Sequence, residues 1–159
     1  MELKNFLFCI LLSLAPISEL RGGIPYGFFH DIPLTIIAPF CIVANALVGP
    51  VAYIFLATFH KIFYRNTWYK NTFDRFVLKA RNKIAPKVTK YGYWGLLLFV
   101  AVPLPVTGAW TGILGSWILG LEKRKTILAI TGGVIISGLI VSILLTCGVG
   151  LNSVFIKRI

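Results

Sequence analysis

Apolar residues form long runs in this chain, and polar residues gather at a few positions between them. The runs at 34–60 and 127–150 are each long enough to cross a bilayer as a helix, which takes about 20 apolar residues. Two further apolar stretches, 5–33 and 93–121, are interrupted near the middle by proline and glycine. Because proline removes a backbone donor and glycine lowers helix propensity, each interrupted stretch predicts two short helical arms separated by a break.

The first break brings charged groups into an apolar neighbourhood. Residues 16–33 contain Glu19 and Arg21 beside two adjacent glycines and carry three prolines, so we expect no continuous helix through this segment. The second break, at 103–109, reads PLPVTGA and leads into a returning arm that begins at Trp110. Ionisable groups inside a membrane are costly, and we therefore take Glu19 and Arg21 as candidate site residues.

The two halves of the chain follow the same order: a short arm, a break, a returning arm and a full span. The pairs Arg21-Gly22 and Thr107-Gly108 occupy corresponding places in this order. Paired short segments interrupted by glycine or proline are typical of inverted-repeat transporters, and non-helical backbone at membrane depth survives only inside protein or along a water-filled cavity. The sequence thus predicts an all-α integral membrane protein, an inverted repeat of two re-entrant helical hairpins that are each followed by a transmembrane helix, with a shared polar site near the bilayer midplane.

A basic segment joins the two halves. Residues 61–92 carry nine lysines and arginines against one acid. Six apolar positions fall on one helical arc of about 100°: Tyr69, Phe73, Phe76, Val77, Ala80 and Ile84. This pattern predicts a basic amphipathic cytoplasmic helix on an anionic membrane surface, or a solvated connector packed on the transmembrane core. The chain is expected to form a single membrane domain, 1–159, made of repeat 1 (1–60), the linker (61–92), repeat 2 (93–150) and a tail (151–159).

Composition and charge agree with a membrane protein. Of the 159 residues, 57% are hydrophobic and 13% are charged, whereas a soluble domain has roughly 45–50% apolar and about 25% charged residues. A net charge of +11 raises nucleic-acid binding, but localised bases in an apolar chain favour a membrane, and no nucleic-acid partner is expected. Re-entrant hairpins and four full spans both distribute the bases as 12 against 3, so the four-span topology stays open.

Two segments, SELRGGIPYG at 18–27 and FVAVPLPVTGAWTG at 99–112, resemble the signature segments of the small multidrug export protein family, and the similarity covers nearly the whole chain. That family is distantly similar to the DedA (VTT-domain) membrane proteins, which have paired re-entrant hairpins and have been linked to the return of undecaprenyl phosphate across the bacterial cytoplasmic membrane. The resemblance implies a multi-pass protein of the cytoplasmic (inner) membrane. One departure is Val106, where the family pattern tends to have glycine. The resemblance implies a substrate-binding site at Glu19, Arg21, Gly22, Gly23, Pro25, Pro103, Pro105, Thr107, Gly108, Trp110 and Thr111.

The residue types at these positions suit more than one role. The planar fork of Arg21 matches phosphate or carboxylate and favours a lipid phosphate, whereas a buried Glu19 can carry a proton and favours a cation antiporter. An ion pair between them that only pins the hairpin is the structural alternative. Thr107, Trp110 and Thr111 suit contacts with a substrate head group, or the satisfaction of broken backbone and packing. Asn45, in the middle of a span, is interpreted as an interhelical hydrogen bond rather than a ligand.

Enzyme motifs are absent from the sequence, so we predict no enzymatic activity, no cofactor and no metal site. The leading function is a small DedA-like transporter that moves an amphiphilic substrate, a polyprenyl phosphate or similar anionic lipid, through the polar site. Proton-coupled efflux of small cationic drugs and a non-transporting scaffold or lipid-organising role are the alternatives. The expected partners are anionic or phosphate-bearing membrane lipids and further copies of the chain, because four membrane segments form a thin wall around a cavity and imply a homodimer or larger homo-oligomer.

Overall fold

The computed structural model describes residues 2–58, 90–104 and 107–156, with isolated residues at 75, 78, 82 and 88. Of residues 57 and 149–156 only the backbone is described. The predicted amphipathic helix of the linker, 69–85, lies outside the described residues apart from these isolated positions, and so does Pro105.

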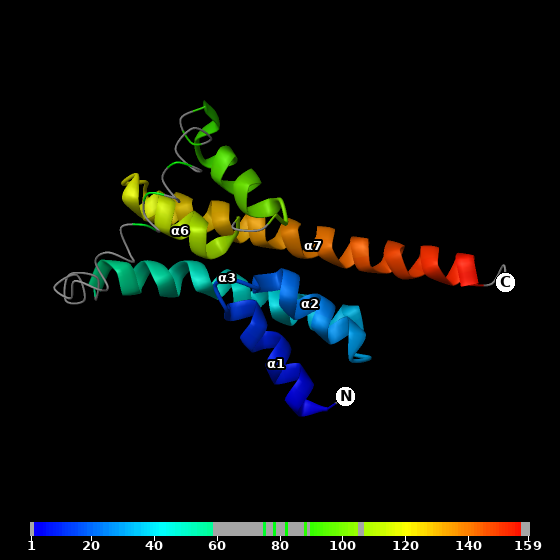
Figure 1. The fold of residues 1–159 in the computed structure, drawn as a ribbon. Helices are drawn as coiled ribbons and strands as arrows, with labels where there is room; N and C mark the ends of the chain where they lie inside the picture. The colour runs from blue at the N-terminus through cyan, green and yellow to red at the C-terminus, as the bar shows by residue number, and fades with distance from the viewer. Residues whose placement is uncertain are drawn as a thin grey trace. The chain divides into compact units, whose positions relative to one another are not determined.

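All the elements formed by the described residues are helices (Figure 1). They are α1 (Leu3–Leu14), α2 (Glu19–Phe29), α3 (Leu34–Thr58), a helical stretch at 90–101, α6 (Ala109–Ile118) and α7 (Lys123–Ile156). Apolar segments long enough to cross a membrane lie in α3, at Leu34–Leu56, and in α7, at Lys123–Gly148. The prediction of helical structure with two long apolar helices is confirmed for this part of the chain.

The remaining labelled helices are much shorter. α1 has 12 residues, α2 has 11 and α6 has 10. At about 1.5 Å per residue these helices extend roughly 15–18 Å, whereas the hydrocarbon core of a bilayer is about 30 Å thick. None of the three is long enough to cross a bilayer by itself.

The chain divides into two compact units. Unit 1 comprises residues 1–45 and 135–159, and unit 2 comprises residues 46–134. Unit 1 therefore holds α1, α2, the start of α3 and the end of α7, whereas unit 2 holds the rest of α3, the stretch 90–101, α6 and the start of α7. Each unit contains one pair of short helices, which we name helix pair 1 (α1 with α2) and helix pair 2 (90–101 with α6).

The second helix of each pair ends in the same backbone motif, 89 residues apart. Asp31 after α2 has a φ of 58°, and Gly120 after α6 has a φ of 66°. In both places the N–H of the following residue donates to the carbonyl five residues earlier, at 3.0 Å. This hydrogen bond defines a Schellman motif, which satisfies carbonyls left over at a helix C-terminus. The long helices then begin at Leu34 and Lys123, again 89 residues apart.

A positive φ recurs at the same spacing near the start of the second helix of each pair, at the first residue of α2 and at the residue before α6, although the two conformations differ. Glu19 has a φ of 49° and Gly108 has a φ of 151°. The predicted correspondence of Arg21-Gly22 with Thr107-Gly108 is therefore wrong by three residues, and Arg21 corresponds to Trp110. A shared glycine suggested that match, but the feature that recurs is a positive φ, which glycine adopts freely and glutamate adopts only with strain.

α2 runs without interruption through the glycines and the proline that predicted a break. The turn lies earlier, at 15–18, Glu19 has a positive φ, and the expectation of non-helical backbone is wrong for 20–29. A Cβ at Gly23 would lie 2.6 Å from the Cys9 carbonyl of α1, and one at Gly27 would lie 2.7 Å from a side chain of α3. These glycines let α2 pack closely on both neighbours, and this packing outweighs their helix-propensity cost of about 1 kcal/mol each.

Candidate functional site

Side chains hold the turn between α1 and α2. The last carbonyls of a helix lack helical partners, and inside a membrane they need partners from the protein. Ser18 Oγ donates to the Leu12 carbonyl at 2.5 Å, and Asn45 Nδ2 of α3 donates to the Ser13 carbonyl at 2.7 Å. The end of α1 is thus fixed both by its own turn and by α3, and the interpretation of Asn45 as an interhelical hydrogen bond is confirmed.

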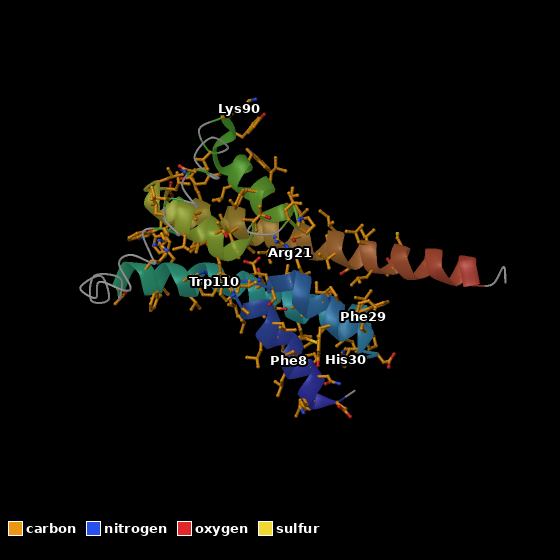
Figure 2. The ribbon with its side chains drawn as sticks, in the orientation of Figure 1. Phe8, Arg21, Phe29, His30, Lys90 and Trp110 are labelled. Atoms are coloured by element: carbon orange, nitrogen blue, oxygen red, sulfur yellow. The ribbon has the colours of Figure 1, made fainter. Side chains whose placement is uncertain are left out.

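Two opposite charges lie at the start of α2. Glu19 is only 7% exposed, and its left-handed backbone costs an L residue about 1–2 kcal/mol. Arg21, labelled in Figure 2, is partly exposed and interacts electrostatically with Glu19. Protein therefore covers Glu19 more fully than Arg21, although the Nε atom of Arg21 is itself buried.

Gly22, Gly23 and Pro25 shape the backbone around Arg21. A Cβ at Gly22 would lie 2.6 Å from Cβ of Ser18, so the turn leaves no room for a side chain there. Pro25 lies inside α2 and has no N–H to donate to the Arg21 carbonyl four residues earlier. All the candidates of the first segment thus lie within the first two turns of α2, where Gly22 and Gly23 allow close packing, and their contact with a substrate stays a prediction.

The turn of helix pair 2 is organised around the Thr107 hydroxyl. Thr107 Oγ1 lies within donating distance of two carbonyl oxygens, that of Val102 at 2.9 Å and that of Leu104 at 2.8 Å. The same oxygen accepts a hydrogen bond from the Leu104 N–H at 3.3 Å. Pro103, between them, has no N–H to contribute. Gly108 is buried with a φ of 151° and a ψ of −170°, a region limited essentially to glycine. These contacts favour the role in which Thr107 satisfies broken backbone over the role of a ligand.

Trp110, which is labelled in Figure 2, and Thr111 lie in the first turn of α6, and both are partly exposed. The first N–H groups of a helix have no helical partners and carry partial positive charge, so this turn offers donors beside an aromatic ring. The candidates therefore form two groups, one at the start of α2 in unit 1 and one at the turn between the stretch 90–101 and α6 in unit 2. Pro105 lies outside the described residues. Contact of Trp110 and Thr111 with a substrate stays a prediction.

The cores of the two helix pairs differ in polarity. Around Gly23 the nearest neighbours are polar or carry sulfur: Ser13, Cys9 and Cys41. Around Gly112 they are aliphatic: Val100, Ile130 and Leu96. Gly23 and Gly112 are 89 residues apart, and at the same spacing the buried Asn45 corresponds to the buried Val134. Helix pair 1 therefore carries polar groups around its central glycine as well as the two charges, whereas the neighbours of Gly112 in helix pair 2 are aliphatic and the buried Ser116 of α6 donates to the Ile113 carbonyl of its own helix.

Sequence reasoning missed the contributions of Ser13 and Ser18. Ser13 is fully buried, and its Oγ donates to the Cys9 carbonyl at 2.9 Å. Serines are common on both sides of a helix end, and the contact between Ser13 and Asn45 spans 32 residues, so no local pattern signals either role. Among the described residues, no three His, Cys, Asp or Glu side chains lie close enough together to hold a metal ion.

One protein family, described as "Putative small multi-drug export protein", matches residues 19–140 of the chain. This segment is well over half of the sequence and contains every candidate site residue. The chain belongs to this family. The predicted family resemblance is thus confirmed, and the family's description indicates an export protein, which is a transport role. No curated protein and no solved structure matches the chain, and the similarity to DedA proteins stays a prediction.

Proposed function

We propose that this protein is a multi-pass transporter of the cytoplasmic membrane that moves an amphiphilic substrate past the start of α2. The proposed substrate is a polyprenyl phosphate, such as undecaprenyl phosphate, or another anionic lipid. Its head binds Arg21 and crosses the membrane, while its tail remains in the bilayer.

The proposed topology has both helix pairs re-entrant. Its support is length: α1, α2 and α6 each extend roughly half of the about 30 Å of a bilayer core. A pair of such helices enters and leaves on the same side, and its turn then lies near mid-membrane. The turns at 15–18 and after 101 have side chains that satisfy their backbone, as segments at that depth require.

The proposal of an anionic substrate rests on the difference in exposure between Glu19 and Arg21. Glu19 is 7% exposed, whereas Arg21 is partly exposed on the same turn of α2. Arg21 is the more exposed of the two residues, although its Nε atom is buried, and arginine presents planar paired donors that match phosphate oxygens. Glu19 then neutralises part of the charge of Arg21 and orients it.

A transport assay with a labelled lipid tests this proposal. The purified protein is placed in liposomes that contain a short polyprenyl phosphate with a fluorescent group near its head, and dithionite added outside reports how fast the inner lipid reaches the outer leaflet. Arg21→Gln and Arg21→Lys should each lower this rate about tenfold or more, equivalent to about 1.4 kcal/mol, because neither side chain has the guanidinium fork. Arg124→Gln, which neutralises an exposed arginine at the start of α7, is the matched control and should transport normally.

Cation transport is measured in parallel with tetraphenylphosphonium. If Glu19→Gln abolishes cation movement while Arg21→Gln leaves lipid movement unchanged, the anionic-lipid proposal is wrong and drug efflux through Glu19 replaces it. If wild-type protein moves neither the lipid nor the cation, the transporter proposal itself is overturned in favour of a scaffold.

A further inference from the structure

The far end of α2 places an acid where the backbone favours glycine. Asp31 occupies the left-handed position of the Schellman motif with a φ of 58°, and the corresponding residue 89 positions later is Gly120. Glycine is the usual residue there because it has no Cβ, and aspartate, although more tolerant than most residues, is strained by comparison. The geometry of the turn therefore does not explain the carboxylate.

This carboxylate lies beside a hollow with aromatic walls. The hollow has a volume of about 520 Å³ and is lined by Phe28, Phe29, Asp31, Ile32, Pro33 and Leu34. The Phe29 ring is 72% exposed and meets the Phe28 ring edge to face, with 5.7 Å between ring centroids. Asp31 is thus the single charged group in a lining that is otherwise apolar.

The carboxylate has no counter-charge in the part of the chain that the structure describes. Asp31 is exposed, and no described lysine, arginine or histidine forms an ion pair with it. The neighbouring His30 is engaged elsewhere, since its ring stacks on Tyr26 with 4.0 Å between centroids and its Nδ1 donates to the Tyr26 carbonyl at 2.8 Å. Figure 2 labels Phe29 and His30 at this end of α2.

We propose that this hollow binds an organic ammonium group carried on an apolar body. The Asp31 carboxylate supplies the opposite charge, the exposed face of Phe29 attracts a cation through its ring electrons, and the aliphatic lining accepts methyl or methylene groups. An anionic head is repelled by the same carboxylate. The site is separate from the charges at the start of α2, because the 11 residues of α2 place Asp31 about 16 Å along the helix from Glu19.

Binding of benzyltrimethylammonium to the full chain in neutral maltoside micelles, followed by calorimetry, tests the site. Asp31→Asn should raise the Kd about tenfold, equivalent to about 1.4 kcal/mol, and Phe29→Leu should raise it about threefold. Asp31→Gly provides a second charge-free variant with unstrained backbone and should match Asp31→Asn. Glu122→Gln, which removes an exposed acid that pairs with Lys125 outside the hollow, is the matched control and should bind as the wild type does.

The same titration in nanodiscs distinguishes two sources of the ammonium group, a lipid head and a soluble amphiphile. If a lipid head occupies the site, phosphatidylethanolamine discs should weaken probe binding relative to discs of neutral glycolipid, and Asp31→Asn should remove this difference. If soluble amphiphiles are the natural ligands, both kinds of disc should give the same Kd. Equal Kd values for wild type, Asp31→Asn and Asp31→Gly would overturn the proposal, as would equally tight binding of uncharged benzyl alcohol. Because the readout is binding, its failure leaves the lipid-transport result at Arg21 unaffected.

Discussion

Replacing Gly108 by alanine should destabilise the protein more than the same change at the other glycines with positive φ. Gly108 is buried and combines a φ of 151° with a ψ of −170°, where a residue with a Cβ costs about 1–3 kcal/mol. Gly92 and Gly120 have φ values of 58° and 66°, and a Cβ at either would have no neighbour within 4 Å. Alanine there should cost about 1 kcal/mol, whereas Gly108→Ala should approach 3 kcal/mol because its surroundings prevent relaxation.

The opposite change at the corresponding position of helix pair 1 should cost little. Glu19→Gly relieves about 1–2 kcal/mol of left-handed strain, and the greater freedom of glycine in the unfolded chain offsets about 0.5–1 kcal/mol of that gain. The lost attraction to Arg21 acts against this gain. The free energy of unfolding should therefore stay within about 1 kcal/mol of the wild-type value.

Unfolding in mixed micelles with a rising fraction of sodium dodecyl sulfate measures these differences through the fluorescence of the four tryptophans. Gly92→Ala and Gly120→Ala serve as matched controls for the loss of a positive-φ glycine. If Gly108→Ala unfolds at the same detergent fraction as Gly92→Ala, the backbone argument is refuted. If Glu19→Gly loses about 3 kcal/mol, the carboxylate rather than the backbone decides stability at that turn, and the correspondence with Gly108 carries no energetic meaning.

Three other predictions follow from the same contacts. Gly23→Ala should destabilise the protein by about 1–3 kcal/mol, because its Cβ would lie 2.6 Å from a backbone carbonyl. Gly112→Ala should cost less than about 1 kcal/mol in the same unfolding assay, because its Cβ would meet a side-chain methyl at 3.0 Å. Equal costs would contradict the packing argument. Asn45→Leu should cost about 1–3 kcal/mol, because it leaves a buried carbonyl at the end of α1 without its donor, and a stable variant would show that the turn does not need α3. The double variant Glu19→Gln with Arg21→Gln should fold but fail to move the labelled lipid, and normal transport by it would reduce the pair to a structural clamp.

Local chemistry sufficed to predict part of the fold. Runs of apolar residues predict the long helices because a span of about 20 such residues has few other stable solutions, and α3 and α7 appear at those places. The same reasoning failed within 16–33, since helix propensity describes an isolated segment. Close packing of Gly23 and Gly27 on neighbouring helices contributes more than propensity removes, and only tertiary contacts show it.

The candidate site, too, could be predicted only in part from the sequence. Charged residues in an apolar stretch are visible in any linear reading, so Glu19 and Arg21 stand out without a structure. Their difference in exposure, which favours an anionic substrate, depends on how the turn folds over the carboxylate. The role of the Thr107 hydroxyl likewise depends on the folded structure, because its partners are carbonyl groups of the turn that it closes.

The sequence by itself determined the class of this protein, its long apolar helices and its charged segment, because hydrophobic length and composition act locally and additively. The tertiary structure decided which positions correspond between the two halves. That correspondence follows positive φ values and helix-end hydrogen bonds that recur at a spacing of 89 residues. The residue types do not reveal it, because Glu19 corresponds to Gly108 and Asp31 corresponds to Gly120. Backbone conformation is a property of the folded turn, so Asp31 and Gly120 share one left-handed conformation, and only the folded chain shows that Glu19 and Asp31 both have a positive φ that glycine adopts without strain.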